Sequence, residues 1–507
     1  MVHKSNKAAI LFLTIQIVSV FLCVVHAQSQ YKIIMNSPTL NGQKMYIGRH
    51  FRDKYIIIDS SQAQQGMVAF VSQNNIDRGV YALLSGEKKK IFDFVVDDSR
   101  FFSIAYDSIH SNAGMKVDGS EANRLMYSYM ARLDDAQKRG REMNDRIKKG
   151  NEKAKNKARK ELENLSTELE RYEKNYMTEN SDYLFTRLIS MFSEDKDTAQ
   201  VPPHASKEDL QRWKSHRTLT TYWDKVDFKD HSLIYTPQLF DKMNYYFFNL
   251  LYYAESDTII HYTHKLLDRM EGDSTMMRYV LDFIMPPYER STRNIGWDQV
   301  FVSLVEDYYL KGKCRWATAA DLYNKRQTIE YLKPSLIGAI GQELLMADTN
   351  QSNNTADWLS SHALPQKYVI LWFWDPDCSH CKRQTAELAH LYDSLENAGN
   401  RQIEVYAVGY ENDTEKWIRY VRQHRLPFVN VGGTNVNINY IDAYNVHGAP
   451  TMIILDADRR IIMNKNIPTN SILPFIEDYE ARHPEQRDRK PSVWQQRGMA
   501  KKMSGKK

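Results

Sequence analysis

The stretch YVILWFWDPDCSHCK, from Tyr368 to Lys382, decides the fold of the C-terminal third of this 507-residue chain. Its first part, Tyr368 to Trp374, is continuously apolar or aromatic, as in a strand that is buried on both faces. Asp375-Pro376-Asp377 ends this run, because proline fixes φ and has no N–H to donate to a sheet. Apolar residues then return at helical spacing, at Ala386, Leu388, Ala389, Leu391 and Leu395. The sequence therefore predicts a buried strand that delivers a CxxC pair to the first turn of a helix.

The two cysteines of this stretch, Cys378 and Cys381, are separated by two residues. Cys378 falls where the predicted helix begins, so unpaired backbone N–H groups and the positive end of the helix dipole favour a thiolate there. The order of strand, CxxC and helix is typical of thiol–disulfide redox chemistry.

Three other interpretations of the CxxC pair are weaker. A zinc site needs further ligands, but the chain has no second CxxC, and Cys314 is the only other cysteine beyond the N-terminal segment. A c-type haem site needs histidine directly after the second cysteine, where this chain has Lys382. A structural disulfide stays open, although so short a loop would restrict little chain entropy.

Residues 336–482 resemble the thioredoxin fold, and in particular the extracytoplasmic thioredoxin-like proteins of the TlpA and ResA type. The resemblance rests on WFWDPDCSHCK, on IEVYAVGYEN (Ile403 to Asn412) and on YNVHGAPTMIILDADRRI. In the last motif, Ala449-Pro450-Thr451 matches the cis-proline of the family, which lies against the active-site cysteines. The resemblance implies a cis bond before Pro450 and a backbone at Ala449 that pairs with an extended substrate. The alternative is an ordinary trans proline before a strand.

The motif and the resemblance together imply disulfide exchange. Cys378 attacks through a mixed disulfide, and Cys381, one turn on and more buried, resolves it. Trp374, His380 and Asp377 are expected to modulate the pair. An imidazolium at His380 favours the thiolate of Cys378, whereas a carboxylate at Asp377 acts in the opposite direction. We expect an intermediate reduction potential, which suits a reductase or isomerase rather than a strong oxidase, and neither a metal nor a cofactor.

The chain departs from the family pattern at positions that usually handle the proton of the second thiol. Trp372 stands where thioredoxins proper carry a buried acid, and Asp377 stands where an aromatic residue usually precedes the first cysteine. Gln384 and Ala386 replace the Glu and Pro that often follow the second cysteine in TlpA-like proteins. The path of proton transfer from Cys381 is therefore left open.

The fold class predicted for the whole chain is multidomain α+β. Residues 28–110 contain short strand-like runs separated by Gly, Asn, Asp and Ser turns, which predicts a β-sandwich-like domain. Residues 111–333 predict a central all-α domain, and residues 334–482 the α/β thioredoxin fold. The first two regions resemble the domains that precede thioredoxin-like modules in Bacteroidetes-type exported proteins. The expected strands of the first domain are Lys44–Arg49, Tyr55–Asp59, Met67–Val71, Val80–Leu84, Lys90–Val96 and Phe101–Tyr106.

The central domain opens with an unusual helical pattern. Asp118-Gly119-Ser120 supplies a helix N-cap, and a charge-rich stretch from Arg132 to Lys160 follows. Leu162, Leu165 and Leu169 then return at a coiled-coil-like spacing. This pattern predicts a long charged helix or helical hairpin that projects from the body. Further helices are expected at Glu208–Val226, Pro237–Tyr253, Asp257–Glu271, Ser274–Ile284, Trp297–Lys311 and Thr318–Glu330.

The two ends of the chain carry signals of their own. Residues 1–27 combine a basic start with an apolar run and Val25-His26-Ala27, which predicts a cleavable signal peptide and export to the periplasm. Cys23 suggests a membrane-associated lipoprotein, but Phe21-Leu22 are too bulky for the usual lipobox. Residues 483–507 predict a basic disordered tail.

Much of the basic charge lies in that tail. The formal net charge is +5, and residues 482–507 hold nine Lys and Arg against two Asp and Glu, so the rest of the chain carries −2. This distribution does not describe a nucleic-acid-binding face, and we expect no nucleic-acid partner. A weak surface contact of the tail with anionic lipid or acidic partners is the remaining expectation.

Two functional hypotheses follow from different classes. The first is an exported thiol–disulfide oxidoreductase that acts on exported proteins with disulfides or thiols and is recharged by a membrane or periplasmic redox partner. The second is a partner-binding scaffold protein in which the thioredoxin module is accessory. The intact CxxC pair at Cys378 and Cys381 and the proline at Pro450 favour the enzyme, since a scaffold could lose either.

Overall fold

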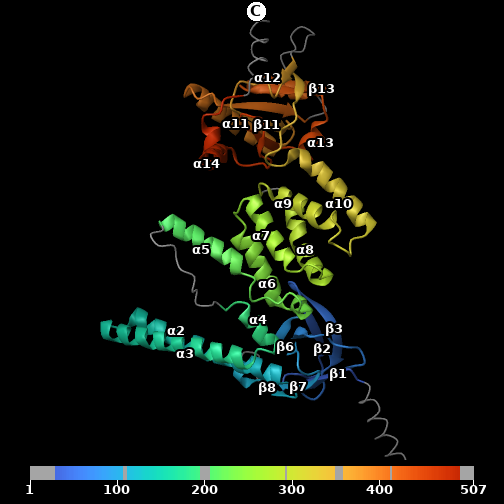
Figure 1. The fold of residues 1–507 in the computed structure, drawn as a ribbon, viewed down its shortest axis with the longest axis vertical. Helices are drawn as coiled ribbons and strands as arrows, with labels where there is room; N and C mark the ends of the chain where they lie inside the picture. Colours follow the sequence, from blue (N-terminus) through green and yellow to red (C-terminus); the bar gives the residue numbers. More distant parts are fainter. Residues whose placement is uncertain are drawn as a thin grey trace, which may run out of the picture. The chain divides into compact units, whose positions relative to one another are not determined.

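The computed structural model describes residues 29–106, 111–193, 206–291, 294–348, 358–410 and 414–491 (Figure 1). The chain divides into two compact units between Tyr252 and Tyr253. The predicted all-α range, residues 111–333, therefore falls partly in each unit. The predicted signal peptide and the last part of the predicted tail lie outside the described residues.

The first unit begins with two four-stranded sheets, in the orders β4-β1-β7-β8 and β3-β2-β5-β6. All six predicted strands are present, and the sequence analysis missed β1 and β8. In β1 the side chains of Tyr31, Ile33 and Met35 are buried in alternation, so one face of the strand packs on the core. The strands are β1 (Tyr31–Asn36), β2 (Lys44–Phe51), β3 (Lys54–Gln62), β4 (Met67–Ser72), β5 (Gly79–Leu84), β6 (Lys90–Val96), β7 (Phe101–Ala105) and β8 (Lys116–Asp118).

The charged stretch forms a helical hairpin of α2 (Glu121–Lys149) and α3 (Glu152–Glu179). Ser120 caps α2 as predicted, because its side chain accepts the backbone N–H of Asn123. The chain reverses at Gly150, and the side chain of Asn151 caps the second helix. The predicted leucine seam faces the first helix, where Ala136, Met143, Leu162, Leu165 and Leu169 pack together.

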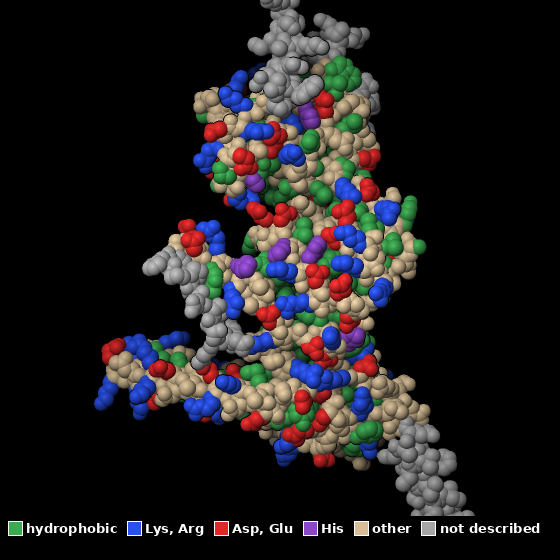
Figure 2. Space-filling view, viewed as in Figure 1, with side chains coloured by type: hydrophobic (Ala, Val, Ile, Leu, Met, Phe, Trp, Pro, Cys, Tyr) green, Lys and Arg blue, Asp and Glu red, His purple; other side chains and the backbone are tan. Residues whose placement is uncertain are grey.

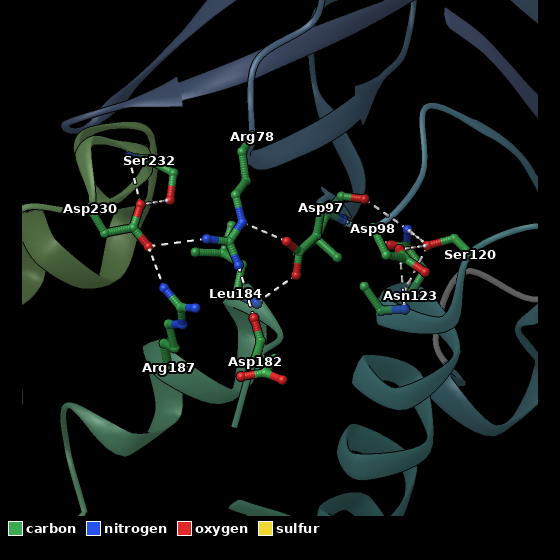
Figure 3. A network of polar contacts seen from close by, with 12 residues as sticks. Arg78, Asp97, Asp98, Ser120, Asn123, Asp182, Leu184, Arg187, Asp230 and Ser232 are labelled. Atoms are coloured by element: carbon green, nitrogen blue, oxygen red, sulfur yellow. Dashed lines mark hydrogen bonds and ion pairs between the residues drawn. The ribbon is translucent and has the colours of Figure 1, made fainter. Parts of the chain in front are cut away.

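A polar network fastens the next helices of this unit to the sheets (Figure 3). Arg78, which precedes β5, pairs with Asp97 and with Asp230, the latter at 3.2 Å. Asp97 also accepts the backbone N–H of Leu184, and Arg187 pairs with Asp230 at 3.2 Å. The helical elements after the hairpin are α4 (Leu184–Ser190), α5 (Lys207–Thr221), η2 (His231–Tyr235), α6 (Pro237–Tyr245) and the π-helical η3 (Tyr246–Leu250).

The second unit starts with a small helical region. Its core is aromatic and aliphatic, with Tyr288, Phe301 and Tyr308 almost completely buried. Its elements are α7 (Ser256–Asp268), α8 (Ser274–Glu289), α9 (Trp297–Leu304), the π-helical η4 (Val305–Tyr309), α10 (Ala319–Leu332) and η5 (Lys333–Ser335). No helix among the described residues is both long and apolar enough to cross a membrane.

A seven-stranded sheet in the order β10-β9-β13-β12-β11-β14-β15 completes the second unit. Its strand β11 (Tyr368–Trp374), which lies between β12 and β14, is buried at every position, as predicted. Alternate residues of β11 enter two different cores, one with Trp372 and one with Phe373. The other strands are β9 (Leu345–Asp348), β10 (Trp358–Ser360), β12 (Ile403–Gly409), β13 (Val429–Val436), β14 (Thr451–Leu455) and β15 (Ile461–Met463). The helices are α11 (Ser379–Asn397), α12 (Thr414–His424), α13 (Tyr440–Tyr444), α14 (Ile472–Arg482) and α15 (Pro484–Arg487).

The predicted disordered tail, residues 483–507, starts too early. Its first part contains α15 and packs on the domain, because the buried ammonium of Lys367 donates to the carbonyl of Arg487 at 2.7 Å. Arg489 also pairs with Asp458 at 3.1 Å. A buried lysine needs acceptors, and the chain after α14 supplies one.

Candidate active site

The two cysteines lie at the junction of β11 and α11, where the sequence predicts them. Cys378 is the N-cap residue of α11, and its Sγ accepts the backbone N–H of Cys381 at 3.1 Å. Cys378 is partly exposed, whereas Cys381 is fully buried. A sulfur that receives a backbone N–H at a helix start is placed to stabilise negative charge.

The buried thiol has a different character. Burial, and then the hydrogen bond with Cys378, raise the pKa of Cys381 to about 12. Cys381 is therefore a protonated thiol at neutral pH. The pair combines one accessible sulfur and one sulfur that the core shields, which is the asymmetry expected of an attacking and a resolving cysteine.

The loop before β14 crosses the end of β11 next to these cysteines. Phe373 pairs with Thr451, so the preceding residues are carried to the CxxC pair. The Ala449–Pro450 bond is cis, as the resemblance implies. The thiol of Cys378 donates to the carbonyl oxygen of Ala449, with a distance of 3.9 Å between sulfur and oxygen.

The three expected modulating residues occupy different environments. Trp374 is fully buried in the same core as Cys381, and its ring packs edge-on against Tyr420 with centroids 5.4 Å apart. Its indole N–H has no hydrogen-bond partner among the described residues. Trp374 thus forms part of the apolar wall behind the cysteines.

His380 and Asp377 are both exposed, and each has a charged partner that the sequence analysis missed. The guanidinium of Arg383 lies 2.7 Å from Nδ1 of His380, so the two side chains are in hydrogen-bond contact. Asp377 forms an ion pair with Lys416 of α12, which offsets its charge beside Cys378.

The positions that usually handle the proton of the second thiol hold neutral groups. The indole of Trp372 donates to Oγ1 of Thr385 at 2.9 Å. Gln384 is buried, and its amide nitrogen donates to the carbonyl of Ile467 at 2.7 Å. Burial raises the pKa of Glu404 to about 7. Glu404 lies opposite Val369 in the pairing of β12 with β11, at the other end of β11 from the cysteines. Its carboxyl group is therefore not their proton acceptor.

Two contacts tie the helical region of this unit to the domain that carries the site. The ring of Tyr331 on α10 lies 5.2 Å from the ring of His447, two residues before Ala449. Asp298 of α9, almost fully buried, accepts hydrogen bonds from Asn464 at 2.7 Å and Lys465 at 3.1 Å. These pairs are far apart in the sequence, and no local motif marks them.

Cys314 lies apart from this chemistry. It is buried with a free thiol, and burial raises its pKa to about 12. Among the described residues, no group of three or more His, Cys, Asp or Glu side chains is arranged to hold a metal ion.

The match to a known protein family falls in the part of the chain that carries the two cysteines. Residues 366–461 match a family model described as Thioredoxin-like. A solved thioredoxin-like protein from Bacteroides caccae is 16% identical, covering 56% of this chain and 100% of its own, with a TM-score of 0.42. A domain of a possible thiol-disulfide isomerase from Cytophaga hutchinsonii is 27% identical, covering 30% of this chain and 98% of its own, with a TM-score of 0.27.

A third solved structure is the thioredoxin domain of a thiol-disulfide oxidoreductase from Bacteroides vulgatus. It is 19% identical, covering 28% of this chain and 96% of its own, with a TM-score of 0.24. No curated protein matches the chain. The family match, the sheet order and the cis-proline beside a CxxC pair agree with one another. Residues 366–461 are thus a thioredoxin-like domain, and it is through this domain that the chain resembles the TlpA and ResA type.

Proposed function

We propose that this chain is a thiol–disulfide oxidoreductase that exchanges disulfides with protein substrates through Cys378 and Cys381. The observation that carries the proposal is the asymmetry of the pair. Cys378 is partly exposed at a helix start, and Cys381 is fully buried one turn later. The first sulfur can reach a substrate, and the second can reach only the first.

In the reducing direction, the thiolate of Cys378 attacks one sulfur of a substrate disulfide. That bond breaks, a mixed disulfide forms, and the other substrate sulfur leaves as a thiolate that takes up a proton. Cys381 then loses its proton and attacks Sγ of Cys378, which releases the second substrate thiol. The substrate gains two electrons, and the protein is left with a Cys378–Cys381 disulfide.

Deprotonation of Cys381 is the demanding step, because its pKa is raised to about 12. The carbonyl of Ala449 lies beside Cys378 and is free to accept an N–H from an extended substrate segment in place of the thiol. Such pairing would hold the mixed disulfide in place while the second thiol attacks.

The setting in which this chemistry would operate is also part of the proposal. The segment 1–27 would export the chain to the periplasm, where the substrates would be exported proteins with disulfides or thiols. A membrane or periplasmic redox partner would return electrons to Cys378–Cys381. The ion pair of Asp377 with Lys416, which offsets the carboxylate beside Cys378, would suit a reductase or isomerase rather than a strong oxidase.

Reduction of insulin disulfides by the full chain tests the proposal. The wild type should reduce insulin with dithiothreitol as the electron source, and Cys378→Ser should abolish this activity. Cys314→Ser is the matched control and should leave the activity unchanged, because that buried thiol lies outside the site. A wild-type chain that is folded but inert, and that binds a partner equally well without its cysteines, would instead support the scaffold hypothesis.

A further inference from the structure

The outer end of the α2–α3 hairpin, residues 138–160, is strongly basic, and we refer to it as the hairpin tip. It holds eleven Lys and Arg against three Asp and Glu, a net charge of +8. The rest of the hairpin, residues 121–137 and 161–179, holds four Lys and Arg against nine Asp and Glu. The net charge of the hairpin therefore changes along its length: it is acidic near the sheets and basic at its far end.

The basic side chains of the tip face solvent. On α3, Lys153, Lys157 and Lys160 follow one another at the spacing of a single helix face, and all three are exposed. The opposite face of the helix is buried against α2 through Ala158 and Leu165. Lys and Arg side chains are visible along this end of the hairpin in Figure 2.

Few of these cations are neutralised within the chain. The described ion pairs engage Arg139 with Asp135 and Glu168, Arg146 with Glu161, and Lys155 with Glu152. Among the ion pairs of the described residues, none involves the stripe of Lys153, Lys157 and Lys160. This stripe keeps its charge available to an external anion.

Hydrogen bonds hold the base of the hairpin to the sheets (Figure 3). The side chain of Asn123 exchanges two hydrogen bonds with the backbone of Val95 in β6, at 2.8 and 2.7 Å. Asp98 accepts hydrogen bonds from the Ser120 hydroxyl at 2.9 Å and from the Glu121 backbone at 2.7 Å. The two helices are 29 and 28 residues long, about 40 Å each at ~1.5 Å per residue. They extend away from the sheets of their own unit (Figure 1).

We propose that the hairpin tip docks on an anionic phospholipid surface through its basic side chains. The tip contains no Phe, Tyr or Trp, so it offers no platform on which nucleic-acid bases could stack. Seven of its eleven cations are lysines, and two of its four arginines are already paired with acidic side chains. Lysine acts as a point charge toward phosphate and needs no shaped partner, as on a lipid surface.

The length of the tip indicates how it would lie. The tip takes residues 138–149 from α2 and residues 152–160 from α3, or about 18 Å and about 14 Å of helix. Charges more than about 8–10 Å from a surface are screened in physiological salt. The tip must therefore lie along the lipid surface for its charge to act, and the stripe of Lys153, Lys157 and Lys160 is the face suited to that contact. Each lysine near the surface should change binding about fivefold.

Co-sedimentation of the full chain with lipid vesicles tests the proposal. The wild type should bind phosphatidylcholine vesicles that contain phosphatidylglycerol, should not bind pure phosphatidylcholine, and should lose binding between about 0.01 M and 1 M salt. The variant Lys153→Glu/Lys157→Glu/Lys160→Glu should bind at least about 100-fold more weakly. Circular dichroism should show that its helix content is unchanged.

The matched control carries the same change of net charge elsewhere in the first unit. Lys116→Glu/Arg171→Glu/Lys174→Glu alters three exposed cations outside the tip and should bind nearly as the wild type does. Equal loss in both variants would overturn the proposal, because total charge and not the tip would then be responsible. Unchanged binding of the tip variant would overturn it as well.

Two further results would contradict the proposal by pointing to another binder or another ligand. Binding that survives in the tip variant but is lost in Lys501→Gln/Lys502→Gln/Lys506→Gln/Lys507→Gln would assign it to the C-terminal segment. Tip-dependent binding of the wild type to duplex DNA, without binding to the anionic vesicles, would make nucleic acid the ligand.

Discussion

The paired strands β11 and β12 bury an ionisable group near each end, and the two groups differ in what they can do. Near the carboxyl end, burial and a hydrogen bond with Cys378 raise the pKa of Cys381 to about 12. At the other end, burial raises the pKa of Glu404 to about 7. Cys381 contacts a partly exposed sulfur, whereas Glu404 is enclosed by Gln366 and Tyr392. Burial perturbs both groups, but only one has a route to a substrate.

The difference shows that a shifted pKa does not by itself mark an active site. At the cysteine end, a helix start, an accessible sulfur and the carbonyl of Ala449 converge on one point. At the carboxylate end, neighbouring side chains donate hydrogen bonds to the buried carboxyl group of Glu404. The group is therefore part of the core. The predictions below separate the two ends.

The largest expected effect is on turnover. Cys381→Ser should abolish multiple-turnover reduction of insulin and accumulate a mixed disulfide on Cys378, because nothing remains to resolve it. Glu404→Gln should reduce insulin at a rate within about twofold of the wild type, since it lies at the far end of the strands. Non-reducing gels and an insulin turbidity assay measure both. A comparable loss in Glu404→Gln would mean that the two ends are coupled.

The second effect is on the pH dependence of the free energy of unfolding. Because the folded pKa of Glu404, about 7, lies above its ordinary value of 4.5, the folded state binds the proton more tightly than the unfolded chain. This contribution is present below about pH 4.5 and is lost as pH rises through about 7. Glu404→Gln should therefore stabilise the domain by up to about 3 kcal/mol at pH 8 and by much less at pH 5. Urea unfolding at several pH values measures this difference.

Glu480 provides a control of opposite sign. Burial alone would raise the pKa of Glu480, but hydrogen bonds from Lys367 and Tyr368 lower it below its ordinary value. Its stabilising contribution is present above the unfolded pKa and is lost as pH falls through the lower folded pKa. Glu480→Gln should thus destabilise the domain at pH 8. If Glu404→Gln also destabilised the domain at pH 8, the raised pKa of Glu404 in the folded state would be contradicted.

The cysteine end of this comparison could be predicted from the sequence, because its main signals are local. The apolar run from Tyr368 to Trp374 and the CxxC pair are each specified within a few residues, whereas the cis bond at Ala449-Pro450 was implied by the resemblance to the TlpA and ResA type. The missed strand β1 also had a local signal, the alternation of Tyr31, Ile33 and Met35.

The remaining features depend on contacts between distant residues. Asp377 and Lys416 are 39 positions apart, and Asp298 and Lys465 are 167 apart, so neither pair has a spacing that could predict it. The division at Tyr252 and Tyr253 falls just after η3, within what reads as one continuous helical pattern. A periodic pattern predicts helices but not which compact unit each one joins.

A smaller effect is expected on the substrate side of the cysteine end. Tyr331→Ala removes the ring that packs against His447 near Ala449. Aromatic contacts of this kind contribute about 0.5–1.5 kcal/mol, so reduction of protein substrates should slow by roughly two- to tenfold. Reduction of a small aromatic disulfide should not change, because such a substrate contacts Cys378 and not the loop that carries His447 and Ala449. Equal slowing of both substrates would indicate a general loss of structure.

The smallest effect concerns the charge beside Cys378. Lys416→Ala frees the carboxylate of Asp377 from its ion pair, and an exposed pair of this kind contributes about 1 kcal/mol or less. The rate of thiol alkylation at Cys378 should fall up to about fivefold at low salt and recover at high salt. The double variant Asp377→Asn/Lys416→Ala should restore the wild-type rate. A loss that persists in the double variant would point to packing by Lys416 instead of charge.

Competitive alkylation tests the central claim, that Cys378 is the accessible nucleophile and Cys381 the shielded thiol. The reduced full chain is treated with limiting iodoacetamide, and the modified cysteine is identified by mass spectrometry over time. Cys378 should be labelled well ahead of Cys381 and Cys314, whose pKa values burial raises to about 12. Labelling of Cys381 first, or of all three cysteines at equal rates, would contradict the account.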